Sequence, residues 1–381
     1  MRKLSRRKLL IVSGATAASA LLNAAGCAPS PQSQPVEKST SITATDVTAA
    51  APSATQAPAA TEAENPTAAP TETPPNPQMT FRRPEIIQFY PAVKSRVIHA
   101  RSADAWQGDK LSPDALRKMV DTSIVTLTGK EDTKSAWLAL FDPGERIAIK
   151  VNAFRNSTIW THPELVYAVT DSLQEAGIPA EQITIFDYWD NELETAGYKL
   201  NKDGPGVRCY GTEDAYTTRW RVAANVSCLL SDILMNTDAL INIPVLKSHM
   251  IAGMTFALKN HYGSVQLPDR LHNIAKCLPG LSTLAPIKDA TRLVIGDVLS
   301  ANTKYSDGWP YWEPDYQGDS ILMSYDPLAH DTVGYEMLLK LAEEKGNPTE
   351  YIIGMAKPWF QTCGDAGIGA NDMSNIELVE V

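Results

Sequence analysis

The sequence predicts an α/β fold, in which a mostly parallel, twisted β-sheet is flanked by helices and preceded by a disordered N-terminal tether. Short apolar runs rich in β-branched residues alternate with segments of helical periodicity, which indicates strands alternating with helices. One strand–helix–strand unit, over 146–186, has the length of a right-handed parallel crossover. Polar residues directly follow the apolar runs, as is typical of the carboxyl ends of parallel strands.

The first 27 of the 381 residues have the pattern of an export signal. Arg6 and Arg7 precede an apolar segment from Leu9 to Ala25 that is rich in alanine, serine and glycine. A positive start, a short apolar core and small residues before a cleavage point are typical of a signal peptide, and the segment is short for a membrane-spanning helix. We therefore predict a signal peptide over 1–27.

Two details of this signal predict the location of the protein. The paired arginines resemble a twin-arginine export signal. Residues 22–27 resemble a bacterial lipobox, whose cysteine, here Cys27, is lipidated after cleavage, although Ala24 stands where leucine is usual. A lipid anchor at Cys27 predicts an extracytoplasmic protein tethered to the outer face of the bacterial cytoplasmic membrane. A plain secretory signal with an incidental cysteine is the alternative.

The rest of the chain divides into a linker and a domain. Residues 28–80 consist mainly of proline, threonine, alanine, serine and glutamine. Such a composition cannot bury enough apolar surface to fold, so we predict a disordered linker. Residues 81–381 are sufficient for one α/β domain that buries roughly three quarters of its unfolded surface.

The predicted domain begins with a strand at 96–100 and a helix at 112–129, where Ser112 is the N-cap and Pro113 occupies the first turn. The elements that follow are a short helix near 137–140, a strand at 146–151, a helix from a capping-box sequence at 161–164 to Gly177, and a strand at 182–186.

Periodicity and turn residues assign the later elements in the same way. They are helices at 229–236, 255–262 and 327–344, strands at 239–243, 292–295 and 321–324, and an edge strand at 376–381. Irregular segments lie at 188–225 and 278–287. A loop at 301–318 carries the aromatic residues Trp309, Tyr311, Trp312 and Tyr316, which suit a lid, a sugar-stacking patch or simple surface packing.

The stretch from Asp238 to His272 is basic, although the whole chain has a net charge of −10. It contains three of the six histidines, and Asp269 is the one acid that interrupts its cations. The basic residues are Lys247, His249, Lys259, His261, Arg270 and His272. This pattern predicts a site for a small anionic ligand, whereas the acidic balance of the chain argues against a nucleic-acid partner.

Ligands of parallel α/β sheets bind beyond the carboxyl ends of the strands. The polar residues that follow the predicted strands are Asn152, Arg155, Asp187, Lys247, His249, Asp297 and Asp326. We expect these side chains to face one crevice. The alternative is that they are polar only because loops are exposed.

His249, Lys259 and His272 are the residues most suited to chemistry. Imidazole serves as a metal ligand or as an acid or base at neutral pH. A lysine shielded from water can act as a nucleophile, or it can keep its charge and hold phosphate. Each histidine could also be a hydrogen-bonded structural residue, and Lys259 with Asn260 could simply close a helix end.

The cysteines of the predicted domain do not form a metal-binding pattern. Cys209, Cys228, Cys277 and Cys363 contain no C-x-x-C pair, which argues against an iron–sulfur cluster or a zinc knuckle. A disulfide between Cys209 and Cys228 is permitted outside the cytoplasm, and four buried free thiols are the alternative that we favour.

Five motifs together resemble the family called domain of unknown function 362. They are AIKVN at 148–152, THPE at 161–164, IPVLKSH at 243–249, TFALKNHYG at 255–263 and DPLAHD at 326–331. The resemblance covers nearly all of 95–381. Members of that family often carry ferredoxin-type cysteine clusters, which this chain lacks, so no iron–sulfur cluster is expected. His330 also departs from the family pattern, and we interpret it as peripheral.

The motif residues Lys150, Asn152, Lys247, Lys259 and Asn260 are the predicted cofactor-binding set. The twin-arginine route carries folded proteins, often with a cofactor already inserted, and a divalent metal is the candidate cofactor.

A more distant likeness concerns the order and spacing of His249, Lys259 and His272, which resemble a segment of the nickel-pincer lactate racemase family. The resemblance implies that Lys259 attaches or anchors a cofactor, that His272 with His249 ligates a metal, and that His249 and His162 are acid–base residues. The glycine pair of that family is absent before Lys259.

The sequence thus supports two functions. The first is a membrane-tethered extracytoplasmic enzyme with a basic crevice for a small anionic substrate or cofactor. The second is a non-catalytic lipoprotein that binds a small anionic ligand. A purely structural lipoprotein is the weakest hypothesis, because it gives no reason for the basic stretch.

Overall fold

The computed structural model describes residues 75–154, 157–304 and 313–381. Several predicted features lie outside these ranges: the signal peptide over 1–27 with Cys27, most of the linker at 28–80, Arg155, Trp309, Tyr311 and Trp312. The end of the predicted linker already contacts the domain, because the side-chain amide of Asn76 exchanges hydrogen bonds of 2.7 and 3.1 Å with the backbone of Arg221.

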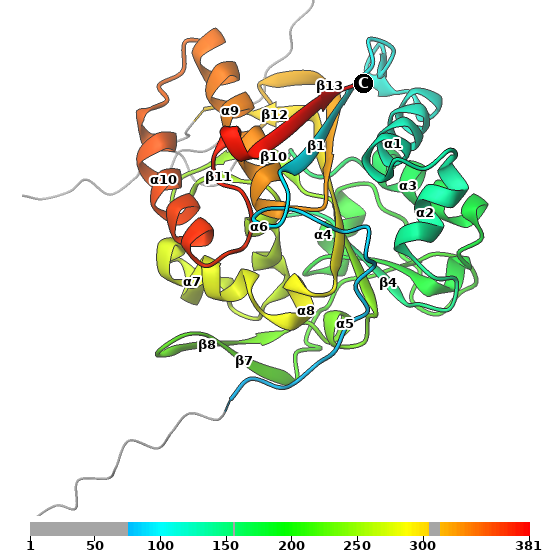
Figure 1. The fold of residues 1–381 in the computed structure, drawn as a ribbon, viewed down its shortest axis with the longest axis horizontal. Helices are drawn as coiled ribbons and strands as arrows, with labels where there is room; N and C mark the ends of the chain where they lie inside the picture. Colours follow the sequence, from blue (N-terminus) through cyan, green and yellow to red (C-terminus); the bar gives the residue numbers. More distant parts are fainter. Residues whose placement is uncertain (1–74, 155–156, 305–312) are drawn as a thin grey trace, which may run out of the picture. The chain divides into compact units, whose positions relative to one another are not determined.

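The domain is built on a ten-stranded sheet, as the predicted α/β class requires (Figure 1). The strand order is β14-β1-β13-β12-β9-β4-β5-β6, and β10 pairs with both β12 and β11. The strands are β1 Ser95–Arg101, β4 Ile147–Lys150, β5 Ile183–Phe186, β6 Arg208–Cys209, β9 Ala239–Asn242, β10 Val245–His249, β11 Gly253–Thr255, β12 Thr291–Asn302, β13 Tyr316–Ser324 and β14 Ile376–Glu380. Strands β12, β9, β4, β5 and β6 run parallel.

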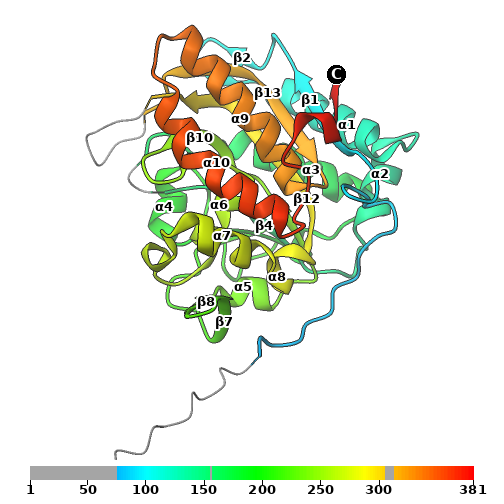
Figure 2. The same cartoon turned by 60° about the vertical axis from the view of Figure 1, so that its left-hand side comes forward.

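Helices cover both faces of the sheet (Figures 1 and 2). One face carries α1 Pro113–Thr128, α2 Thr133–Leu140 and α3 Pro163–Ala176; the other carries α6 Ala257–Asn260, α7 Ile274–Ser282, α8 Ala285–Lys288, α9 Pro327–Glu344 and α10 Glu350–Asp365. The short helices α4 Asp190–Thr195 and α5 Asp232–Met235 lie in connections. Small ribbons are formed by β2 Trp106–Gln107 with β3 Lys110–Leu111, and by β7 Thr218–Ala223 with β8 Val226–Leu230.

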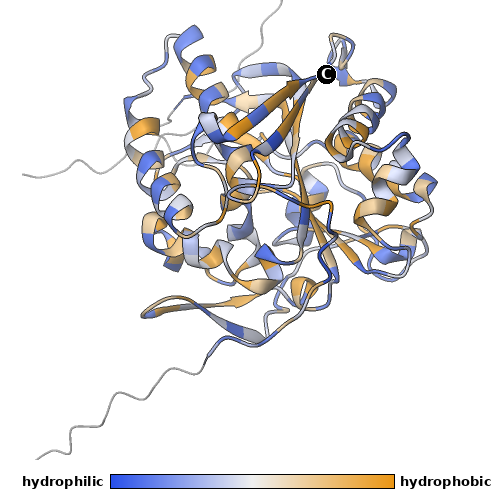
Figure 3. Ribbon diagram, in the orientation of Figure 1, coloured by the Kyte–Doolittle hydropathy of each residue, from blue (hydrophilic) through white to orange (hydrophobic). Residues whose placement is uncertain are grey.

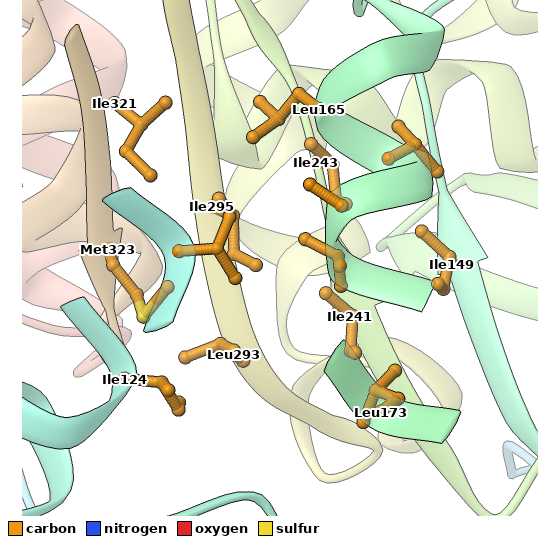
Figure 4. Close-up of a cluster of buried hydrophobic side chains, with 14 of the residues drawn as sticks. Ile124, Ile149, Leu165, Leu173, Ile241, Ile243, Leu293, Ile295, Ile321 and Met323 are labelled. Carbon is orange, nitrogen blue, oxygen red and sulfur yellow. The ribbon is translucent and has the colours of Figure 1, made fainter. Parts of the chain in front are cut away.

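Buried apolar side chains fill the layers between sheet and helices. The ribbon in Figure 3 shows hydrophobic residues along the strands and on the helices beside them. Figure 4 shows the layer beneath α1 and α3, where Ile149, Ile241 and Ile295 from three strands contact Leu165 and other helical residues. Because adjacent residues of a strand point to opposite faces, each of these strands contributes to both apolar layers.

Most predicted elements are confirmed with small shifts in their ends. Ser112 accepts a hydrogen bond from the Ala115 backbone N–H at the start of α1, and Gly129 ends that helix with a φ of 66°. The predicted helix at 327–344 is α9 with the same ends, and the predicted edge strand at 376–381 is β14.

Four element predictions need correction. The strand predicted at 292–295 is longer and runs from Thr291 to Asn302. The segment 278–287 is largely helical, 229–236 contains the end of β8 and the short α5, and 188–225 contains α4, β6 and β7. Helix α10 was not predicted.

The prediction that Asp326 faces the crevice is wrong. It follows β13, which runs antiparallel to β12, so its end lies at the opposite edge of the sheet from the ends of β4, β5 and β9. There Asp326 accepts hydrogen bonds from the backbone N–H groups of Leu328 and Ala329 and caps α9.

The four described cysteines are buried free thiols, as the favoured alternative predicts. Burial raises the pKa of Cys209 and of Cys228 to about 12, so these thiols stay protonated at neutral pH. In the described part of the chain, none of the helices combines the length and the hydrophobicity that crossing a membrane requires.

Candidate anion site at the carboxyl edge of the sheet

The carboxyl end of β4 carries a buried ion pair. Lys150 is fully buried, and its Nζ lies 2.6 Å from Asp187 Oδ1 and 2.5 Å from the carbonyl oxygen of Val151. Asp187 follows β5, and its Oδ2 accepts a hydrogen bond of 2.6 Å from the backbone N–H of Ala153. Burial lowers the pKa of Lys150, and the charge of Asp187 opposes that shift. The pair joins the ends of two parallel strands at the edge where ligands bind.

Side-chain amides extend from this pair toward β10. Asn260 Oδ1 lies 3.5 Å from Lys150 Nζ and accepts a hydrogen bond of 3.2 Å from Asn152 Nδ2. Asn152 Oδ1 in turn accepts a hydrogen bond of 2.8 Å from Lys247 Nζ, which also donates to the carbonyl oxygen of Ile159. Burial lowers the pKa of Lys247 to about 7. Four of the five predicted cofactor-binding residues thus form one hydrogen-bonded group.

Helix α6 supplies Lys259 and Asn260, and a carboxylate from α9 positions it. The side chain of Asp331 accepts hydrogen bonds of 2.7 and 3.0 Å from the backbone N–H groups of Ala257 and Leu258. A carboxylate at this end of a helix satisfies amide groups that have no partner within the helix. Asp331 therefore helps to hold the two site residues of α6 in place.

A second set of contacts ties α6 to the sheet. Asn242 of β9 donates a hydrogen bond of 2.8 Å to the carbonyl oxygen of Ala257 and accepts one of 2.8 Å from Asn260. Gly263 lies in the turn after α6, where a Cβ atom would come within 2.4 Å of Asp187 Oδ1. The site therefore needs glycine at this position, because any larger residue would displace the carboxylate.

Lys259 is a buried cation that has no counter-ion among the residues that the structure describes. It is 6% exposed, and its Nζ lies 4.3 Å from the centroid of the Tyr262 ring. This ammonium group forms no hydrogen bond or ion pair with the residues of the described ranges, so it does not cap the last carbonyl groups of α6. Burial and then the charge of Lys247 lower the pKa of Lys259 to about 7, while the exposed Asp269 opposes the shift.

His249 presents a hydrogen-bond donor. Its Nδ1 accepts hydrogen bonds of 3.0 and 3.3 Å from the backbone N–H groups of Ile251 and Ala252. A neutral imidazole with an accepting Nδ1 carries its proton on Nε2. Burial, and then the charge of Lys259, keep the pKa of His249 well below its usual value, so this neutral form persists at neutral pH.

His272 has the opposite arrangement and presents an acceptor. Its Nδ1 lies 3.2 Å from the carbonyl oxygen of Asp269, which can only accept, so Nε2 of the neutral ring carries a lone pair. The ring stacks on His249 with centroids 6.2 Å apart and lies 5.7 Å from the ring of Tyr262. Burial and the charge of Lys259 lower the pKa of His272. Tyr262 thus lies between Lys259 and His272, whose ring in turn stacks on His249.

His162 is paired with Asp297, beside the group formed by His249, Lys259 and His272. Its Nδ1 and its backbone N–H both lie 2.8 Å from Asp297 Oδ2, and Trp106 contacts the ring edge-on at 5.8 Å. Burial alone would lower the pKa of His162, but the charge and hydrogen bond of Asp297 outweigh it and the net shift is upward. The carboxylate fixes the tautomer in which Nε2 is the basic atom.

The capping box predicted at 161–164 is wrong. His162 is the N-cap residue of α3, and its side chain makes no capping hydrogen bond because it binds Asp297. Thr161 instead donates a hydrogen bond of 2.7 Å to the carbonyl oxygen of Ile243 and accepts one from the Asn152 backbone N–H. These contacts place His162 next to the strand ends that carry the site.

The expectation that His330 is peripheral is also wrong. The ring is fully buried and lies 4.3 Å from the ring of Phe256, directly before α6. A Cβ atom at Gly296 would come within 2.4 Å of its Nε2. His330 therefore packs behind the helix that carries Lys259.

The described donor atoms do not fit a divalent metal. Within 75–154, 157–304 and 313–381, no three or more histidine, cysteine, aspartate or glutamate side chains are grouped as metal ligands. The two predicted ligands also differ, since His249 presents an N–H at Nε2 and only His272 presents a lone pair. We therefore derive no step through a metal at these histidines.

Residues 147–336 match the family model for domain of unknown function 362. No curated protein matches the chain.

Two solved structures are similar to part of the chain. The lactate racemase apoprotein from Thermoanaerobacterium thermosaccharolyticum has 9% identity and a TM-score of 0.31, with 54% of this chain and 50% of that chain covered. A structural-genomics protein from Thermotoga maritima has 14% identity and a TM-score of 0.34, with 63% of this chain and 60% of that chain covered. The chain spans only half to 60% of these proteins.

The matched segment 147–336 contains Lys150, Asn152, His162, Lys247, His249, Lys259, Asn260 and His272, which are the predicted catalytic, cofactor-binding and metal-binding residues. By this match, residues 147–336 belong to the family described as domain of unknown function 362.

Proposed function

We propose that the domain binds a small anionic substrate or cofactor at the cluster of Lys247, His249, Lys259 and His272, and that it is an enzyme acting on this ligand. The observation that carries the proposal is the buried ammonium group of Lys259, which has an aromatic face but no hydrogen-bond or ion-pair partner in the described ranges. A buried charge without a counter-ion destabilises a fold, and an anion would supply the missing partner.

The two histidines give the cluster the groups needed for proton transfer. His272 Nε2 is a base in the neutral ring, and His249 Nε2 is a hydrogen-bond donor that could hold an oxygen atom of the ligand. Lys259, with a pKa lowered to about 7, is partly neutral at neutral pH and is then a nucleophile; when it is protonated, it binds the anion. The reaction class supported best is proton transfer or covalent catalysis on a small oxyanion.

The location of the protein is part of the proposal. The twin-arginine and lipobox patterns support an extracytoplasmic domain held at the membrane by lipidated Cys27 and a linker over 28–80. Labelling with radioactive palmitate in a bacterial host, compared between the full chain and Cys27→Ala, tests the anchor. Label retained by Cys27→Ala would refute it.

Anion binding is tested by isothermal titration with inorganic phosphate and with glycolate. We expect Lys259→Gln to weaken the binding of one or both at least tenfold. Lys340→Gln is the matched control, because the side chain of Lys340 is 77% exposed. Equal affinity in both variants would contradict the proposal, provided that neither unfolds below the wild-type temperature.

The enzyme and the binding protein predict different results for protein purified from its own host. An adduct on Lys259 by mass spectrometry, or conversion of a bound ligand that Lys259→Gln and His272→Gln abolish, supports the enzyme. A saturable ligand that is returned unchanged supports the non-catalytic lipoprotein.

A further inference from the structure

The ribbon formed by β7 and β8 carries a basic face that takes no part in the proposed anion site. Arg219 and Arg221 of β7 are exposed. Trp220 and Val222 alternate with them and are buried, so the two arginines point outward from the same face of the ribbon. Arg270, later in the chain, lines the same surface hollow as Arg219. The three arginines therefore gather beside the ribbon, which lies at the bottom of Figure 1.

These three arginines form no ion pair with the residues that the structure describes. The side chains of Arg221 and Arg270 also form no hydrogen bond there, and Arg219 donates one of 3.3 Å to a neutral serine hydroxyl of β8. Asp269 precedes Arg270, but its carboxylate lies 3.5 Å from His272 Nδ1. Several exposed arginines elsewhere in the domain do pair with carboxylates: Arg96, Arg101 and Arg146. The positive charge of the β7–β8 face is therefore left uncompensated.

An exposed leucine lies among these arginines. Leu267 lines the same hollow as Arg219 and Arg270 and is 49% exposed. Its backbone has a φ of 55°, in the left-handed region that is unfavourable for leucine and more easily adopted by glycine or asparagine. An apolar side chain held at a strained and exposed position points to a function outside the fold of the domain itself.

The N-terminal part of the chain joins the domain beside this face. The side-chain amide of Asn76 exchanges hydrogen bonds with the backbone of Arg221, and the first described residues, drawn in blue, begin next to β7 (Figures 1 and 2). The chain before this point contains the predicted lipid anchor at Cys27. The linker from the anchor therefore enters the domain next to the three arginines.

We propose that the face formed by Arg219, Arg221, Leu267 and Arg270 docks on the anionic lipid headgroups of the membrane that holds the protein. The guanidinium groups bind the phosphate oxygens of the headgroups, and Leu267 enters the interfacial layer. Although the whole chain has a net charge of −10, salt screens charges beyond about 8 Å at physiological ionic strength, so the local face governs the contact. The inference rests on the membrane location in the proposed function, and it is independent of the anion site at Lys259.

The test is co-sedimentation of the full chain carrying Cys27→Ala with lipid vesicles, so that no attached lipid contributes to binding. Vesicles made of equal parts phosphatidylglycerol and phosphatidylcholine are compared with vesicles of phosphatidylcholine alone. We expect phosphatidylglycerol to strengthen binding and added salt to weaken it. Each arginine near an anionic surface strengthens binding roughly fivefold, so the triple variant Arg219→Gln, Arg221→Gln and Arg270→Gln is expected to bind anionic vesicles about tenfold or more weakly.

A matched control removes three exposed lysines from the other face of the sheet, in or beside α1 and α2: Lys118→Gln, Lys130→Gln and Lys134→Gln. This triple variant has the same net charge and the same N-terminal segment, and it is expected to bind like the parent chain. Leu267→Asn tests the apolar part. Asparagine tolerates the left-handed backbone, so we expect an unchanged or higher Tm together with vesicle binding that is about threefold weaker.

The proposal is overturned if phosphatidylglycerol does not strengthen binding, or if the arginine and lysine triple variants bind anionic vesicles equally well. It is also overturned if Leu267→Asn lowers the Tm and leaves vesicle binding unchanged, because the leucine would then serve the fold. A failure of the lipid anchor would instead appear in the palmitate labelling. A failure of the anion site would appear in the titrations of Lys259→Gln.

Discussion

Replacing Lys259 by methionine isolates the cost of a buried, unpaired charge. Methionine keeps most of the apolar length of lysine but has no ammonium group. The lysine is 6% exposed, and its ammonium contacts the Tyr262 ring without a hydrogen bond in the described ranges. We therefore predict that Lys259→Met increases the free energy of unfolding near neutral pH and at the same time abolishes anion binding.

The magnitude follows from the pKa of this lysine. Burial and the charge of Lys247 lower it from 10.5 to about 7. Each tenfold change in proton affinity corresponds to about 1.4 kcal/mol, so keeping the proton in the folded state costs roughly 5 kcal/mol below about pH 7. Between about pH 7 and 10.5 the unfolded chain binds more protons than the folded one, so stability rises with pH and the penalty disappears. Lys259→Met also loses the contact between the ammonium group and the Tyr262 ring. We therefore expect this variant to have a free energy of unfolding that is higher than that of the wild type by about 2–4 kcal/mol at low pH.

Urea unfolding of the wild type, Lys259→Met and Lys340→Met at about pH 6, 8 and 10 measures this effect. The difference between Lys259→Met and the wild type is expected to be largest at pH 6 and to shrink toward pH 10. Lys340→Met is expected to match the wild type throughout, because its side chain is 77% exposed. A Lys259→Met protein that is less stable at every pH would refute the reasoning, since the ammonium group would then have a partner in the fold.

Three further predictions concern the groups around the site and the base of the sheet. Gly263→Ala is expected to lower the unfolding free energy by about 1–3 kcal/mol in urea, because its Cβ meets Asp187 Oδ1 at 2.4 Å, whereas Gly144→Ala has open space and should be neutral. Asp331→Asn is expected to cost about 1–2 kcal/mol and to weaken phosphate binding, since α6 loses a charged cap; unchanged affinity would contradict its positioning role. Arg292→Leu is expected to cost about 3 kcal/mol, because Arg292 is fully buried and pairs with Glu145 at 2.5 Å. Burial would raise the pKa of Glu145, but Arg292 lowers it to about 2, so this contribution should be lost as the pH falls from about 4.5 to 2, and a flat stability profile there would refute it.

The helices that the sequence predicted best are those whose ends are marked by capping residues. Helix α1 lies between Ser112 and Gly129, and α9 begins after Asp326. Helix α10 was missed because Pro358 lies within it, and Pro279 has the same effect in α7. The strand β12 was predicted too short because its glycine and aspartate are common in turns, whereas here the glycine lets the His330 ring approach the sheet.

The sequence also identified which charged residues gather at the sheet edge, but not what surrounds them. Lys150, Lys247 and Lys259 lie in motifs that follow or adjoin apolar strands, and topology brings strand ends together. The roles of Tyr262 and Asp331 were not foreseen. The Tyr262 ring packs against the Lys259 ammonium group, and Asp331 caps α6 from a helix more than seventy residues later in the chain. Both contacts depend on tertiary packing, which no local sequence pattern encodes.

The most direct test of the unpaired-lysine claim is the pKa of Lys259 itself, followed by NMR of the full chain labelled with ¹³C at lysine Cε and assigned by loss of the signal in Lys259→Gln. We predict a titration midpoint near 7 in the free protein, as burial without a counter-ion requires, and a higher midpoint once inorganic phosphate is added. A midpoint near 10.5 that phosphate does not move would show that the ammonium is already solvated or paired, and it would contradict the proposed anion site.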